Sequence, residues 1–227
     1  MRKFFRFTAL LLALCCLFPR VKATSTKYVA LTFDDGPVGK ITERLLDGLK
    51  RRQVTATFFL CCYRITDHPE LVQRMANEGH EMGVHGCSHK YFTQMSKKEL
   101  TDEILCTKTA IQNLTGNSPK LIRPPGGLYN ERVRQLAESE GLSLILWNVD
   151  PEDWDPARRA GTVKMVTERV KHGDVVLLHD LSYENVQNTL ALIDNLHAKG
   201  FRFCTVSELA EIGKTPLLSG KIYTAFP

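Results

Sequence analysis

The sequence predicts an α/β protein built on one parallel sheet. From residue 28 to residue 205, short runs rich in β-branched and aromatic residues alternate with segments of helical periodicity. The runs are apolar almost throughout, which is typical of strands that helices bury on both faces. With 227 residues, 43% of them hydrophobic, the chain can form one large core but is short for two domains. We therefore expect a single domain in which outer helices surround a closed or nearly closed parallel sheet.

Seven strands are expected from the apolar runs, most of which end at polar or turn-forming residues. In chain order, they cover residues 28–33, 56–60, 81–84, 120–123, 143–147, 174–178 and 202–205.

Helical periodicity and helix-capping residues place helices between these strands. The expected helices cover residues 40–52, 69–79, 97–115, 130–140, 161–171 and 184–199. Ser96 and Glu99 have the spacing of a capping box. Glycines follow four of the helices, where a left-handed cap is expected: Gly79, Gly116, Gly141 and Gly200. The final segment, 213–227, lacks helical periodicity and is expected to be a loosely packed tail, which leaves 24–212 as the folded domain.

Residues 1–23 are predicted to be a secretory signal peptide. Three cations, Arg2, Lys3 and Arg6, precede an apolar run at 7–18, and small residues at 21 and 23 suit signal peptidase. The run is shorter than the ~20 residues that span a bilayer, which disfavours an uncleaved anchor. We expect a protein that is secreted or held in the cell envelope.

Charge and cysteine content exclude several classes of function. Residues 1–23 carry five cations and no acid, so they account for the whole net charge of +5. A neutral mature chain gives no reason to expect nucleic acid or anionic lipid as a partner, and nothing in the sequence implies a stable protein partner. The five cysteines after the signal are odd in number and show no CxxC spacing, so no disulfide framework is implied.

Unusual polar residues follow the expected strands. Because the carboxyl ends of parallel strands form one end of such a fold, these residues should converge there. They are Asp34, Asp35, His85, His89, Arg123, Asp150, Asp153, Trp154, His179 and Asp180.

Two of these groups suggest a metal-assisted reaction. Adjacent carboxylates point in different directions, so Asp35 can bind a metal while Asp34 serves as a base, although Asp-Asp-Gly is also an ordinary turn. His85 and His89 would share one face if the chain there is helical, and with Asp35 they form a two-His, one-Asp set that leaves coordination positions open. Two surface histidines are an equally good interpretation of this spacing alone. Cys87 is a rival ligand, but at a spacing of two it faces away from the pair on a helix.

The motifs together make the resemblance specific. The sequence resembles the polysaccharide deacetylase family, the carbohydrate esterases that share the NodB homology domain, over residues 27–210. Five motifs match in order: Thr-Phe-Asp-Asp-Gly at 32–36, the pair His85 and His89, Arg-Pro-Pro-Gly-Gly at 123–127, Asp-Pro-Glu-Asp-Trp at 150–154 and Leu-Leu-His at 177–179.

This resemblance implies a deformed (β/α) barrel and a role for each matched residue. Asp34 would be the general base, His179 the general acid, and Asp35, His85 and His89 the ligands of one divalent metal. By the same resemblance, Arg123 orients Asp34, Asp153 keeps His179 protonatable, Trp154 and Leu177 shape the acetyl pocket, and the Gly126 N–H donates to the oxyanion. Zinc is the expected metal, and cobalt or nickel would also accept these ligands. Gly126 departs from the family pattern, which commonly has Tyr there.

The implied reaction removes acetyl groups from N-acetylglucosamine-type polysaccharide of the cell envelope and releases acetate. Peptidoglycan is the preferred substrate, and chitin oligomers or exopolysaccharide carry the same acetamide. Two alternatives stay open: a glycoside hydrolase that uses Asp34 with Asp150 or Asp153, and a non-catalytic sugar-binding barrel.

Overall fold

The computed structural model describes residues 26–227, so the predicted signal peptide at 1–23 lies outside the described residues. Across the described range, no helix combines the length and the apolar character needed to cross a bilayer.

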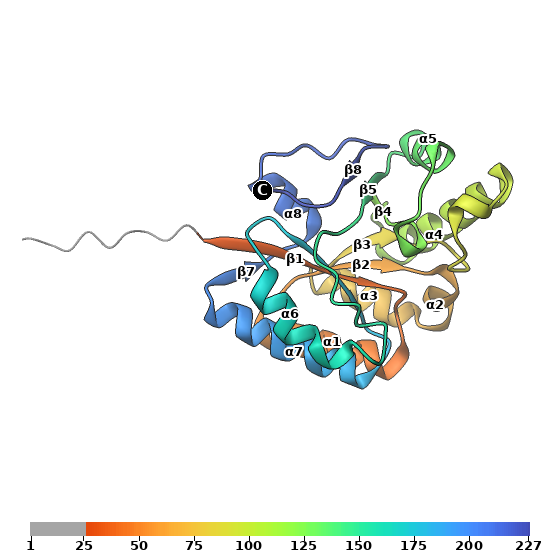
Figure 1. The fold of residues 1–227 in the computed structure, drawn as a ribbon. Coiled ribbons are helices and arrows are strands. Elements are labelled where there is room, and N and C mark those ends of the chain that lie inside the picture. The colour runs from red at the N-terminus through yellow and green to blue at the C-terminus, as the bar shows by residue number, and fades with distance from the viewer. Residues whose placement is uncertain (1–25) are drawn as a thin grey trace, which may run out of the picture.

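Eight parallel strands form the sheet in the described part of the chain (Figure 1). They run in the order β6-β1-β2-β3-β4-β5-β8, and β7 pairs with the first half of β1 while β6 pairs with the second half. An isolated bridge between Val149 and Val176 joins the chain after β5 to β6, so the sheet curves back on itself. The fold is therefore the predicted deformed (β/α) barrel. The strands are β1 (Lys27–Asp34), β2 (Thr57–Leu60), β3 (Glu81–Val84), β4 (Leu121–Ile122), β5 (Ser143–Ile145), β6 (Val175–His179), β7 (Phe201–Phe203) and β8 (Ile222–Tyr223).

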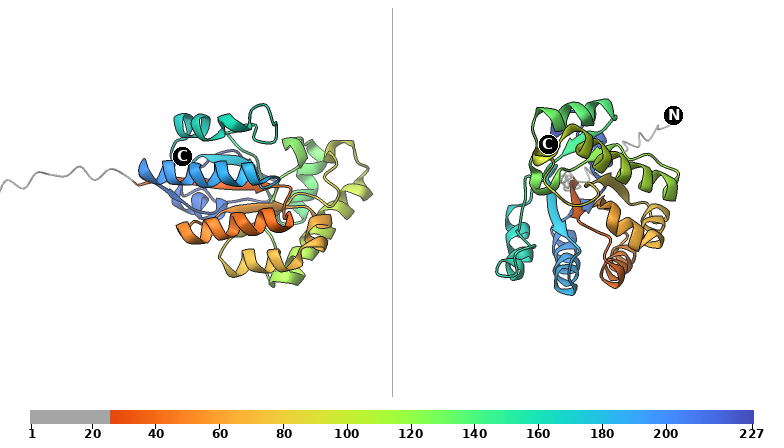
Figure 2. Two further views of the ribbon diagram at one scale, coloured as in Figure 1. Left: turned by 90° about the horizontal axis from the view of Figure 1, so that it is seen from below. Right: turned by 90° about the vertical axis from the view of Figure 1, so that its right-hand side faces the viewer.

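Helices surround the barrel, and the neighbours α6, α7, α1, α3 and α4 pack side by side (Figures 1 and 2). The six expected helices are all present to within a few residues, and Ser96 and Glu99 form the expected capping box. Two further helices, α2 and α8, have only six and seven residues, too few for a periodic pattern to reveal them. The helices are α1 (Gly39–Arg52), α2 (Cys62–Asp67), α3 (Pro69–Asn77), α4 (Lys97–Thr115), α5 (Glu131–Ser139), α6 (Thr162–Arg169), α7 (Tyr183–Ala198) and α8 (Val206–Ile212), with 3-10 turns η1 (Phe92–Gln94), η2 (Pro125–Gly127) and η3 (Arg159–Gly161).

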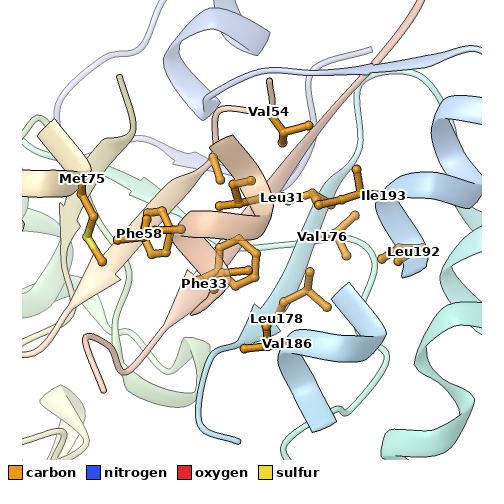
Figure 3. Packing of buried hydrophobic residues seen from close by; sticks show 14 of the residues in the cluster. Leu31, Phe33, Val54, Phe58, Met75, Val176, Leu178, Val186, Leu192 and Ile193 are labelled. Atoms are coloured by element: carbon orange, nitrogen blue, oxygen red, sulfur yellow. The ribbon is translucent and has the colours of Figure 1, made fainter. Parts of the chain in front are cut away.

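The central strand β1 is fixed by apolar packing along its length. Leu31 and Phe33 lie in the main core with Val176 of β6 and side chains of α7 (Figure 3). The Phe33 ring stacks on Phe58 of β2, with 5.1 Å between ring centroids. Because β1 packs in this way against strands on both sides, the backbone that leads to Asp34 and Asp35 is held rigidly.

The prediction of a loosely packed tail at 213–227 is wrong. Within it, β8 pairs with β5, and Tyr223 stacks on Phe226 with 5.5 Å between the rings. The Phe226 side chain is fully buried, and its N–H donates to the Gly173 carbonyl over 2.7 Å. A strand of two residues is too short for alternation in the sequence to mark it.

Candidate active site

The polar residues predicted at the strand ends do converge at one end of the barrel. Asp34 is the last residue of β1 and pairs in register with His179, the last residue of β6. His85 directly follows β3, Arg123 directly follows β4, and Asp153 lies in the loop after β5. Parallel pairing of these strands therefore gathers residues from across the chain around Asp34.

Arg123 is a fully buried guanidinium that orients Asp34. Its Nη1 donates to Asp34 Oδ1 over 2.7 Å and to Thr32 Oγ1 over 2.8 Å. Its remaining donors reach the carbonyls of Ile145 and Leu146, each over 3.0 Å. Burial lowers the pKa of Arg123, and the Asp34 carboxylate opposes that effect. With four of its five N–H donors bonded, the guanidinium holds Asp34 Oδ1 in place and leaves Oδ2 available as a base.

Asp153 holds His179 in one orientation. Asp153 Oδ1 lies 2.7 Å from His179 Nδ1, and Oδ2 accepts from the His179 N–H over 2.9 Å. Burial would lower the pKa of His179, but the Asp153 carboxylate outweighs it and raises that pKa to about 9. Since Nδ1 is committed to Asp153, Nε2 is the atom left to give a proton to a substrate.

Asp35, His85 and His89 form a three-ligand cluster. Asp35 Oδ1 lies 3.2 Å from His85 Nε2 and 2.9 Å from His89 Nε2. Burial opposes ionisation of Asp35, but the contacts with both imidazoles prevail and lower the pKa of its carboxyl. Contact with the Asp35 carboxylate likewise raises the pKa of His89.

The hydrogen bonds of this cluster suit a cation. His85 Nδ1 lies 2.7 Å from the Arg123 carbonyl, which can only accept, so Nδ1 carries a proton. In the neutral ring, the Nε2 lone pair therefore points at Asp35 Oδ1, a buried oxygen with no hydrogen-bond partner among the described residues. Two electron pairs facing each other across a buried gap are unfavourable until a positive ion lies between them. The donor set thus fits a divalent metal with nitrogen and carboxylate ligands.

The chain between the two histidines is a loop, and the helix considered from their spacing is wrong. Gly86 and His89 have positive φ values of 94° and 58°, and these turns bring the two rings to 5.2 Å between centroids. Asp35 also has a positive φ, 72°. Two of the three candidate ligands thus adopt a backbone conformation that side chains disfavour, a strain that folded proteins concentrate at functional sites.

The residues expected to meet substrate lie in different environments. Gly126 sits in η2 at a φ of 63°, and a Cβ there would lie 3.1 Å from the ring of Tyr91. Tyr91 is half exposed and lines a cleft that also includes His89 and Met95. Trp154 is 55% exposed, whereas Leu177 in β6 is buried. Trp154 is therefore open to solvent, and Leu177 is part of the packed wall of the barrel.

Comparisons with known proteins show the family of this chain. The family described as polysaccharide deacetylase matches residues 21–145. A peptidoglycan-N-acetylglucosamine deacetylase from Bacillus cereus is 38% identical over 188 residues, which cover 81% of this chain and 88% of that protein. This chain belongs to the polysaccharide deacetylase family. The chain is also 40% identical over 198 residues to the peptidoglycan-N-acetylglucosamine deacetylase PgdA of Listeria monocytogenes, covering 85% of this chain but only 42% of PgdA.

A solved structure of the same family matches the whole barrel. The family 4 acetyl xylan esterase from Clostridium thermocellum, solved in complex with a cobalt ion, superposes with a TM-score of 0.82. It is 30% identical and covers 88% of this chain and all of its own.

In the present chain, two residues that contact the site could not be identified from the sequence. Asn185 of α7 donates to Asp153 Oδ2 over 2.9 Å, so it fixes the carboxylate that fixes His179. Tyr91 fills the space beside Gly126, the position where the family commonly places a tyrosine. Neither residue lies in a motif, and each acts through a contact that only the folded chain creates.

Proposed function

We propose that this chain is a metal-dependent polysaccharide N-deacetylase that removes acetyl groups from N-acetylglucosamine-type units of peptidoglycan. The observation that carries the proposal is the joint presence, at one barrel end, of an oriented base, a protonated acid and a three-ligand cluster. Each would be of little use alone, whereas amide hydrolysis requires all three.

The residues divide the reaction between them. Asp35, His85 and His89 would hold the ion, which when bound supplies Lewis acidity to polarise the acetamide carbonyl and activate water. Asp34 accepts the proton of the attacking water, because Arg123 holds Oδ1 and leaves Oδ2 available. His179 donates a proton to the leaving amine, which departs poorly as an anion. We assign the Gly126 N–H as a donor to the oxyanion, with Trp154 and Leu177 beside the acetyl group.

Zinc is the metal we propose. Its tetrahedral preference and its affinity for imidazole and carboxylate fit three protein ligands with a position left for water. Cobalt and nickel accept the same donors, and metal analysis of the purified protein separates the three.

Peptidoglycan is proposed as the substrate because the curated relatives described above carry that name. Chitin oligomers and exopolysaccharide offer the same acetamide. Because one similar structure is an acetyl xylan esterase, acetylated xylan is also tested as a substrate. The predicted signal peptide supports a place outside the cell, in the medium or in the envelope, where peptidoglycan lies.

The glycoside hydrolase alternative gains no support from the contacts of its carboxylates. Asp34 is paired with Arg123, and Asp153 is paired with His179 and Asn185. Asp150 accepts from the Trp147 Nε1–H over 3.2 Å and from the Glu152 N–H over 2.8 Å. The non-catalytic alternative would explain an incomplete site, but the base, the acid and all three ligand positions are filled.

Acetate release tests the proposal. Zinc-loaded protein and the Asp34→Asn variant are incubated with peptidoglycan, N-acetylglucosamine oligomers and acetylated xylan, and acetate and new reducing ends are measured. We expect acetate from the wild type on peptidoglycan, no new reducing ends, and loss of release on chelation. Equal release by wild type and variant on every substrate would overturn the proposal, and new reducing ends would favour the glycoside hydrolase.

A further inference from the structure

Three cysteine thiols from distant parts of the sequence meet beside the loop that carries His85 and His89. Cys62 is the first residue of α2, Cys87 lies in the loop itself, and Cys106 lies on α4. The Sγ atoms of Cys62 and Cys106 are 3.0 Å apart, those of Cys87 and Cys106 are 3.8 Å apart, and all three lie within 4.8 Å of one another.

The closest pair is within about 1 Å of the length of a disulfide bond. Cys106 is exposed and Cys62 is buried beneath it, so one member of the pair is open to an external reagent and the other is shielded. Small side-chain rotations would close this gap, and neither α2 nor α4 would have to move far.

The surroundings favour a neutral cross-link over a thiolate metal site. The described residues bring only these three ligands into the cluster, whereas structural zinc sites use four. Burial, reinforced by the neighbouring thiols, raises the pKa of Cys62 and so disfavours its thiolate. The Glu103 carboxylate accepts a hydrogen bond from the loop next to Cys87. Its negative charge disfavours a second negative charge, that of a thiolate, in this cluster.

We propose that Cys62 and Cys106 form a disulfide that fastens α2 to α4 across the loop that carries His85 and His89. A low-molecular-weight disulfide is the oxidant. Cys106 attacks it to give a mixed disulfide and releases one small thiol. Cys62 then attacks the Cys106 sulfur, the protein S–S bond forms, and the second small thiol leaves. The two protein sulfurs lose two electrons and two protons in total, which reduce the external disulfide to two thiols.

The cross-link would join the two elements that hold the loop. On one side, the Cys62 N–H donates to the Gly86 carbonyl over 3.1 Å. On the other side, Glu103, three residues before Cys106 on α4, accepts from the Ser88 N–H over 2.8 Å and from the Cys87 N–H. A bond between Cys62 and Cys106 keeps these anchors at a fixed separation, so the loop should open less often. This inference does not depend on the proposed function.

The test uses the purified chain without its signal, first reduced and then incubated with oxidised glutathione. Free thiols are alkylated, and the protein is digested without reduction and analysed by mass spectrometry. We expect a linked peptide pair containing Cys62 and Cys106, with Cys61, Cys87 and Cys204 alkylated. The oxidised protein should melt about 5–10 °C higher than the reduced protein, and the amides of residues 86–89 should exchange more slowly with deuterium.

Matched variants separate the bridge from general oxidation. Cys106→Ser, at an exposed position, should fold normally and lose the linked peptide, the melting shift and the added protection. Cys204→Ala, which removes a buried thiol outside the cluster, and Cys87→Ser should keep the linked peptide.

Three results would overturn the proposal: five alkylated thiols after oxidation, a bridge that involves Cys87, or a bridge that leaves exchange at 86–89 unchanged. A second equivalent of Zn²⁺ in the reduced protein that Cys106→Ser loses, without a linked peptide on oxidation, would show a metal site in its place.

Discussion

The two halves of the catalytic site differ in how completely the protein satisfies them. Around His179, the protein fixes the ring through Nδ1: Asp153 contacts Nδ1 and the backbone N–H, and Asn185 in turn contacts Asp153, while Nε2 stays available. Around Asp35, a buried oxygen has no hydrogen-bond partner among the described residues, and two imidazoles face it. The half around His179, which we call the acid half, is therefore held by protein contacts alone. The half around Asp35, His85 and His89, which we call the ligand half, is arranged for an ion. Substitutions should affect the two halves in different ways.

The largest effect is expected from Asp35→Asn, which removes the anionic ligand. Loss of metal-derived stabilisation, several kcal/mol, should lower kcat/KM by about 10³-fold or more. In chelator the variant should melt close to the metal-free wild type, because the amide keeps the shape of the carboxylate and Asp35 Oδ1 has no hydrogen bond among the described residues to lose. Steady-state kinetics, metal analysis and melting curves in chelator measure these effects. A variant that melts well below the metal-free wild type would show that protein contacts of Asp35, and not an ion, stabilise this part of the site.

Arg123→Met is expected to act mainly on stability. It leaves Asp34 buried without its partner, which typically costs about 3–5 kcal/mol of the free energy of unfolding. Urea denaturation at neutral pH measures the loss. The double variant Arg123→Met with Asp34→Asn should regain part of it, and a double variant no more stable than Arg123→Met alone would show that the ion pair is not the cause.

Asp153→Asn tests the acid half through pH. His179 must be protonated to act as an acid, so activity should persist up to its pKa of about 9 and fall as the pH rises through that value. Without the carboxylate, the alkaline limb of kcat/KM should move toward the ordinary histidine value of 6.5, with kcat lower by about 10²-fold at neutral pH. A pH profile covering the acid and alkaline limbs gives the answer. Asn185→Ala serves as a milder control that should shift the same limb less, and an unmoved limb in Asp153→Asn would exclude His179 as the acid.

The smallest effect is expected from Tyr91→Ala, outside both halves. The ring beside Gly126 offers one aromatic contact to a sugar, so its loss should raise KM about 3–10-fold and leave kcat unchanged. Tyr91→Phe keeps the ring and should behave as the wild type. A fall in kcat with constant KM would place Tyr91 in the chemistry and not in binding.

The barrel and most of the site were predictable because short, strongly patterned segments encode them. The strands before Asp34, His85 and His179 are apolar runs, and parallel pairing alone brings their ends together. The loop at 86–89 was not predictable, since Gly86 and His89 adopt positive φ values that no periodicity reveals. Asn185 and Tyr91 act through contacts between distant segments, and β8 is too short to carry a pattern.

The position of β1 has a consequence for how the molecule matures. β1 ends at Asp34, directly before Asp35, and lies early in the chain, yet it pairs along its second half with β6, where Thr32 Oγ1 donates to the Val176 carbonyl, 144 residues further on. Synthesis proceeds from the N-terminus, and contacts between such distant segments form late in folding. A partly synthesised chain therefore carries Asp34 without His179, and the site can assemble only when nearly all of the chain has been made.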